Sequence, residues 1–60
     1  MKVKYLGETT TMKSVSGKDV KLEKSGEYEC MEKEYHSALF VRIVVDGDHV
    51  KVRRADLKKV

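Results

Sequence analysis

The sequence predicts an all-β fold, a small barrel of five short strands with one short helical turn near residues 54–57. Three observations lead to this prediction. Nine of the 60 residues are valine, a β-branched residue that favours strands over helices. Polar and apolar residues alternate in several short runs. Turn-forming residues separate these runs. No proline or linker divides the chain, so residues 1–60 are expected to form one domain.

The first part of the chain predicts a strand followed by a long loop. Residues 2–6 (KVKYL) alternate polar and apolar and end at Gly7, as a strand with one buried face does. Residues 8–18 (ETTTMKSVSGK) are rich in Thr, Ser and Gly, which indicates a loop. We expect at most a short extended piece of that loop around Met12 and Val15.

The middle of the chain predicts a turn and a second strand. Residues 20–23 (VKLE) alternate, and residues 25–26 (SG) then reverse the chain direction. Residues 27–30 (EYEC) start the next strand, with their two apolar side chains on one face. The alternation breaks at Met31, which predicts a bulge that bends the strand, as a small barrel requires.

The longest apolar run, residues 38–45 (ALFVRIVV), predicts a central strand that begins after a turn at residues 36–37. The side chains expected to face the core are Leu39, Val41, Ile43 and Val45. The pleat then places the intervening side chains on the opposite face, namely Phe40, Arg42 and Val44. A shift of one residue in register would exchange the two sets.

The last third predicts a hairpin, a helical turn and an edge strand. Residues 46–48 (DGD) form a tight hairpin turn, because Gly47 adopts a positive φ without steric cost. Residues 50–53 continue the alternation with valines inward and basic side chains outward. Residues 54–57 (RADL) are expected to form one helical turn, and residues 58–60 a final edge strand.

This order of elements resembles the Src-homology-3-like small barrel. Residues 19–30 (DVKLEKSGEYEC) are similar to the divergent-turn segment of that fold, and residues 52–60 (VRRADLKKV) to its strand, helical turn and last strand. The resemblance covers residues 19–60, and small bacterial and phage proteins of unknown role share it. Peptide-binding members use an aromatic-lined groove for proline-rich ligands. This chain has no Trp and no Pro, and VRRA stands where an aromatic is expected, so the resemblance implies the fold and no binding site.

The positive charge of the chain lies entirely in its last third. Residues 1–41 contain seven lysines and seven acidic residues, whereas residues 42–60 contain six basic and three acidic residues, which gives the net charge of +3. The side chains that we predict for a binding surface combine this charge with the outward residues of the central strand: Phe40, Arg42, Val44, Lys51, Arg53 and Arg54.

Two functions fit this predicted surface. The first is a non-enzymatic binding module that contacts a protein partner, or a second copy of itself, through the outer face of residues 38–45. The alternative is single-stranded nucleic-acid binding, with Phe40 stacking on bases and the basic side chains contacting phosphates. Two simpler structural explanations remain open. Glu27 and Glu29 can pair with Arg42, or the loop at residues 8–18 can cover Phe40.

Other chemistries are not indicated. Cys30 is the only cysteine, which fits a reducing cytoplasmic setting and excludes an internal disulfide. The spacing of acids in residues 46–57 does not match a calcium loop, so we expect no metal site. His36 and His49 lie at predicted turns, and no nucleophile motif accompanies them, so we expect no catalytic residues, cofactor or small-molecule substrate. No apolar run approaches the ~20 residues of a membrane span.

Overall fold

The computed structural model describes residues 1–60 and places about half of them in seven strands. The elements are β1 Lys2–Tyr5, β2 Thr10–Lys13, β3 Asp19–Leu22, β4 Glu27–Cys30, α1 Glu32–Ser37, β5 Phe40–Val45, β6 Asp48–Arg53, the 3₁₀ helix η1 Arg54–Asp56 and β7 Leu57–Lys59. One antiparallel sheet has the order β6-β5-β4-β1-β7, and β2 and β3 form a separate hairpin. The prediction of a mostly β domain is therefore confirmed.

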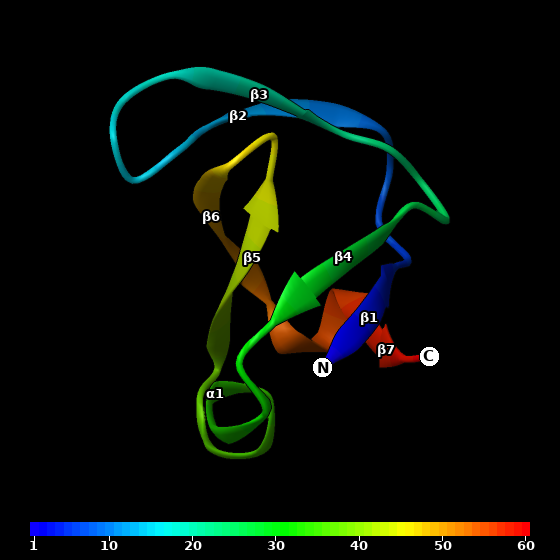
Figure 1. Cartoon of the computed structure of the whole chain (residues 1–60). Coiled ribbons are helices and arrows are strands. Elements are labelled where there is room, and N and C mark those ends of the chain that lie inside the picture. Colours follow the sequence, from blue (N-terminus) through cyan, green and yellow to red (C-terminus); the bar gives the residue numbers. More distant parts are fainter.

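The two sheets do not join into a closed barrel. Strands β6 and β7 are the two edges of the five-stranded sheet, and neither forms a ladder with the β2–β3 hairpin. Figure 1 shows this hairpin arching over the end of the sheet where β5 turns into β6, while α1 lies at the opposite end. The prediction of a five-stranded barrel is thus correct in part: the larger sheet has five antiparallel strands, but the chain has seven strands and no closed barrel forms.

The core forms between the inner face of the sheet and the β2–β3 hairpin, and alternation within each strand fills it. Val41, Ile43 and Val45 of β5 are buried, as are Val50 and Val52 of β6. The other strands add the remaining buried apolar side chains, namely Val3, Tyr5, Val20, Leu22, Cys30 and Leu57. The predicted inward set of residues 38–45 is confirmed for the three β5 residues. It is wrong for Leu39, whose side chain precedes the strand and is 82% exposed.

Residues 32–37 form a helix where the sequence analysis expected a bulged strand and a turn. Glu32, Lys33 and Glu34 are good helix formers, and acidic side chains in the first turn interact favourably with the helix dipole. The Ser37 hydroxyl donates to the Lys33 carbonyl at 2.7 Å, which closes the last turn. The bulge predicted at Met31 and the turn at residues 36–37 are therefore wrong. At six residues, α1 is far too short to cross a membrane, and no other helix is longer.

The expected loop at residues 8–18 contains strand β2. Met12 lies opposite Val20 and packs against the core, so the extended piece predicted around Met12 is confirmed. Val15 instead lies in the turn that joins β2 to β3 and is exposed. Thr and Ser are poor loop markers here, because β-branched threonines also suit a strand that is exposed on one face.

The β5–β6 hairpin has the two-residue turn that its sequence predicts. Asp46 and Gly47 both have positive φ, 52° and 78°, which is typical of a type I′ turn. The predicted helical turn is the 3₁₀ helix η1, and the last strand, β7, begins one residue earlier than expected. Turn chemistry thus determines this part of the fold.

Replacement of Gly47 by alanine is expected to lower the free energy of unfolding by roughly 1 kcal/mol. An added Cβ meets no atom within 4 Å, so the cost comes only from the positive φ. Urea denaturation of the two proteins measures the difference, and an unchanged midpoint would contradict the prediction.

Candidate interaction surface

The register of β5 and β6 brings five of the six predicted surface residues onto one face. Phe40 lies opposite Arg53, Arg42 opposite Lys51, and Val44 opposite His49. Directly opposed residues in an antiparallel pair share a face, and all six of these side chains are exposed. Arg54, the sixth predicted residue, follows in η1 and borders the same hollow as Phe40. His49 is the one member of this face that the sequence analysis missed.

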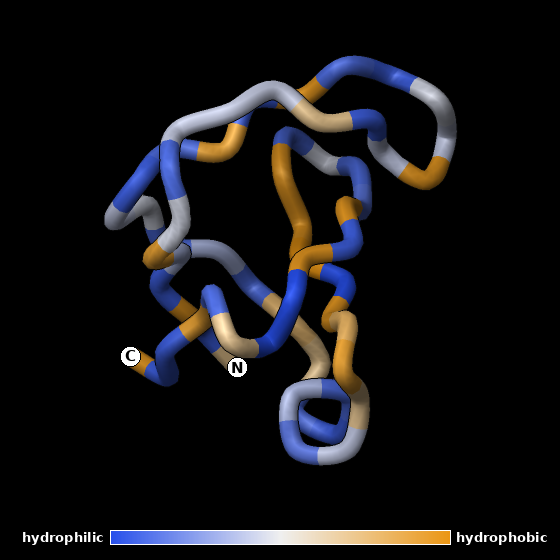
Figure 2. The backbone as a smooth tube through the Cα atoms, turned by 180° about the vertical axis from the view of Figure 1, so that it is seen from behind, coloured by the Kyte–Doolittle hydropathy of each residue, from blue (hydrophilic) through white to orange (hydrophobic).

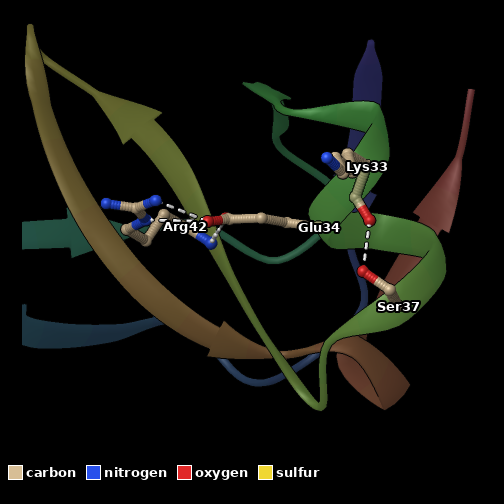
Figure 3. A network of polar contacts seen from close by, with 4 residues as sticks. All are labelled: Lys33, Glu34, Ser37 and Arg42. Carbon is tan, nitrogen blue, oxygen red and sulfur yellow. Dashed lines mark hydrogen bonds and ion pairs between the residues drawn. The ribbon is translucent and has the colours of Figure 1, made fainter.

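The charge of Arg42 is neutralised by Glu34 of α1. The guanidinium donates from Nε at 3.0 Å and from Nη2 at 2.6 Å to Glu34 Oε2, while the Arg42 backbone N–H donates to Oε1 at 3.1 Å. Figure 3 shows the Glu34 side chain extending from the helix to Arg42. These hydrogen bonds lower the pKa of Glu34 and raise the pKa of Arg42. The ion pair considered with Glu27 or Glu29 is therefore wrong, because the helix provides the carboxylate.

Arg53 also has an internal partner. Its Nε and Nη2 both donate to Asp56 Oδ2 at 3.3 Å. Lys51 and Arg54 have no carboxylate within ion-pair distance. Of the four predicted cations on this surface, two are paired and two are free to meet an external anion.

An apolar corner lies where β5 begins. Leu39 and Phe40 are 82% and 57% exposed, and together with Ala55 they border a hollow of about 300 Å³ whose other lining residues are Arg53 and Arg54. The Arg54 N–H donates to the Leu39 carbonyl at 2.9 Å, which fixes the two sides of the hollow. Figure 2 shows that the hydrophobic run starts directly after the hydrophilic helix. We call residues 39, 40 and 55 the apolar corner.

The loop at residues 8–18 does not cover the apolar corner. Its tip is attached to the far end of the hairpin, where the Val15 N–H donates to the His49 carbonyl at 2.8 Å. Asp48 Oδ2 accepts hydrogen bonds from the hydroxyls of Ser14 and Ser16. The predicted alternative in which this loop shields Phe40 is therefore wrong.

The acidic turn at residues 46–48 has a structural role that the sequence did not reveal. Hydrogen bonds from Ser16, Ser14 and the His49 backbone lower the pKa of Asp48 to about 2. No three His, Cys, Asp or Glu side chains come together in a way that could hold a metal ion. Asp48 uses its carboxylate to fasten the tip of the β2–β3 hairpin to β6.

A pH dependence of stability follows from this lowered pKa. Stabilisation by Asp48 is fully present above its ordinary pKa of 3.8 and is lost as the pH falls toward 2. We expect wild type to be more stable than Asp48→Asn at pH 6 and the difference to shrink as the pH falls through about 2. Urea midpoints across this range measure it. A difference that stays constant with pH would contradict the assignment.

Cys30 and the histidines do not form an activated pair. Burial is the main cause of the raised pKa of the Cys30 thiol, which disfavours the thiolate that a nucleophile needs. His49 borders a hollow of about 220 Å³ together with Cys30, Met31 and Val44. His36 lies elsewhere, edge-to-face against Tyr35.

Comparison of the chain with models of protein families, with curated proteins and with solved structures finds no match.

Proposed function

We propose that the protein is a non-enzymatic interaction module that binds a protein partner through the outer face of residues 38–45. The expected partner presents a large apolar side chain flanked by carboxylates. The apolar side chain occupies the hollow at the apolar corner, and the carboxylates meet Arg54 and Lys51.

The observation that carries this proposal is the exposure of Leu39 and Phe40 side by side. Both are large apolar residues at the end of the sheet, and a hollow lies beside them. An exposed apolar cluster with a polar rim is typical of an interaction site. Aromatic and arginine side chains, both found here, are enriched among the residues that dominate binding energy.

The free charges favour an acidic partner over a second copy of the chain. Lys51 and Arg54 form no internal ion pair, whereas Arg53, at the same corner, is paired with Asp56. In a symmetric dimer this corner would face itself, so the arginines of both copies would come together. Like charges at a desolvated contact oppose binding, whereas carboxylates complement them.

The test selects peptides from a displayed random library against the wild-type protein, with Phe40→Ser as the counter-target. We expect enrichment of sequences with a large apolar residue next to Asp or Glu. For a synthesised peptide, Phe40→Ala is expected to weaken binding by at least about tenfold. This loss of affinity is expected to depend little on the salt concentration, because the Phe40 side chain is uncharged. Val60→Ala, which removes an exposed apolar side chain near β7, is the matched control. A library without any peptide whose binding depends on Phe40 would refute the proposal.

The alternative proposal is single-stranded nucleic-acid binding by the same face. Its support is the register of β5 and β6, which places Phe40 beside Arg53 and Arg42 beside Lys51. It ranks second because Glu34 and Asp56 already neutralise two of the four cations. Fluorescence anisotropy with a mixed-sequence oligonucleotide tests it. Binding absent at about 100 µM in low salt dismisses it, whereas salt-sensitive binding weakened by Lys51→Ala and Arg54→Ala would favour it.

The fold is proposed to be a Src-homology-3-like small barrel in which the edge strands β6 and β7 do not pair to close the sheet. The support is the strand order β6-β5-β4-β1-β7 together with the 3₁₀ turn directly before the last strand. In this reading the β2–β3 hairpin takes the place of the long loop after the first strand. The helix α1 then replaces the loop between the second and third strands of the barrel.

A further inference from the structure

The outer edge of β6 contains backbone groups that point away from the sheet. The Arg54 N–H donates to the Leu39 carbonyl, so residues 39 and 54 form a hydrogen-bonded pair. In an antiparallel ladder such pairs alternate with pairs that exchange no hydrogen bonds. Lys51, opposite Arg42, and Arg53, opposite Phe40, belong to the second kind. Their backbone N–H and C=O groups therefore point outward.

Most of the edge beside these residues already has partners. The His49 carbonyl accepts from Val15, and the His49 N–H donates to Asp48 Oδ1 at 2.8 Å. Arg53 is the N-cap of η1, where the cap carbonyl accepts the first bond of the helix. The N–H and C=O of Lys51 and the N–H of Arg53 have no such partner. Three adjacent backbone groups thus remain available on one edge.

Space for another chain exists beside this edge. A hollow of about 420 Å³ lies between Lys51 and the end of β2, where Lys13, Ser14 and Val15 line it. The two sheets are not paired at this place, and their only backbone link here is the Val15–His49 hydrogen bond. An extended segment can therefore approach Lys51 without displacing a strand.

We infer that the edge of β6 at Lys51 and Arg53 binds an extended acidic segment of a protein partner by strand addition. This inference rests on the proposed function, because the added strand would widen the outer face next to Phe40. Main-chain hydrogen bonds supply affinity in this binding mode, and alternate side chains supply specificity. Side chains of the segment opposite Lys51 and Arg53 lie on the outer face, where a carboxylate complements the unpaired charge of Lys51 beside the Arg53–Asp56 ion pair.

A second copy of this chain is a poor occupant of the same edge. Antiparallel pairing of two β6 edges would place Lys51 and Arg53 against the same residues of the other copy. Directly opposed like charges destabilise a strand pair, and lysine on an edge strand is a common protection against self-association. The charges that oppose a dimer are those that favour an acidic strand.

The test uses the ¹⁵N-labelled protein and a capped seven-residue peptide of alternating threonine and glutamate. Amide hydrogen exchange at Lys51 and Arg53 is expected to slow at least tenfold at saturating peptide. A peptide of the same sequence with N-methylated backbone amides, which cannot complete the ladder, is expected to give no protection. A peptide of alternating threonine and lysine tests the charge requirement and is expected not to bind.

Matched variants separate edge binding from general electrostatic attraction. Lys51→Glu combined with Arg53→Glu is expected to raise the Kd at least tenfold. Lys58→Glu combined with Lys59→Glu makes the same charge change on β7, the opposite edge, and is expected to change the Kd less than twofold. Equal effects of the two double variants would overturn the inference.

Further outcomes distinguish this inference from the proposed function. Library peptides that depend on Phe40 but leave the Lys51 and Arg53 amides unprotected would overturn strand addition and retain the interaction surface. Protection by the glutamate peptide without any ligand that depends on Phe40 would retain strand addition and refute the surface at the apolar corner. Protection at millimolar protein that disappears on dilution, with no peptide present, would show a second copy at the edge and overturn the acidic partner.

Discussion

Replacement of Ile43 by alanine is expected to lower the free energy of unfolding by about 2–5 kcal/mol. The side chain is fully buried in the middle of β5 and is one of the largest in the core. Stability near 0.05–0.15 kcal/mol per residue gives a chain of this length only about 3–9 kcal/mol in total. The variant is therefore expected to be partly or fully unfolded at room temperature.

Circular dichroism during thermal and urea denaturation measures this loss. The control is Val44→Ala on the same strand, because Val44 faces outward and is 38% exposed. We expect the control to cost no more than about 1 kcal/mol. A stable Ile43→Ala protein, or equal effects of the two variants, would contradict the arrangement of the core.

Replacement of Ser14 by alanine is expected to cost about 1–3 kcal/mol, because Ser14 is the one polar residue in the buried set. Its hydroxyl donates to Asp48 at 2.7 Å and accepts from the Lys18 N–H at 3.1 Å. The alanine variant leaves both partners without this group. The attachment of the β2–β3 hairpin to β6 weakens as a result.

The measurement for Ser14 compares urea midpoints with those of Ser16→Ala. Ser16 also donates to Asp48 but is exposed, so water can replace its hydroxyl and the expected loss is smaller. Amide exchange at Val15 is expected to quicken in Ser14→Ala, since its hydrogen bond to His49 depends on the same attachment. A larger loss in Ser16→Ala would assign the main role to the exposed hydroxyl instead.

Strand β5 was predictable because a period of two residues determines which side chains are buried. Val41, Ile43 and Val45 alternate with more polar or exposed residues, and the Asp46–Gly47 turn fixes the register of the next strand. Leu39 fits the same alternation but lies before the strand begins. Periodicity alone cannot show where a strand starts, so this residue was placed in the core by mistake.

The helix α1 was missed because six residues are too few to show a helical period. Its sequence contains no buried residue, so no apolar pattern marks one face. The available signal was local, namely three consecutive charged helix formers after Met31. Missing the helix also hid the ion pair of Glu34 with Arg42. Together with the ion pair of Asp56 and Arg53, it neutralises two of the four cations that the sequence analysis assigned to the surface.

The sequence predicted which residues share the candidate surface but not which of its cations are paired with carboxylates. Pleat parity placed Phe40, Arg42 and Val44 together, and the hairpin register added Lys51 and Arg53. The carboxylates that neutralise the two arginines come from short helical segments whose positions depend on tertiary packing. The free backbone groups at Lys51 were likewise not predictable. Their availability depends on how the β2–β3 hairpin packs beside the edge of β6.

The hydrogen bond between Ser14 and Asp48 also bears on the order in which the chain folds. It joins residues 34 positions apart, whereas the β5–β6 hairpin closes through a two-residue turn. Short loops cost less entropy to close, so the hairpin can form before the distant attachment does. A contact made after the rate-limiting step affects mainly the unfolding rate. We therefore expect Ser14→Ala to speed unfolding and leave the folding rate nearly unchanged, so that loss of this contact shortens the lifetime of the native state.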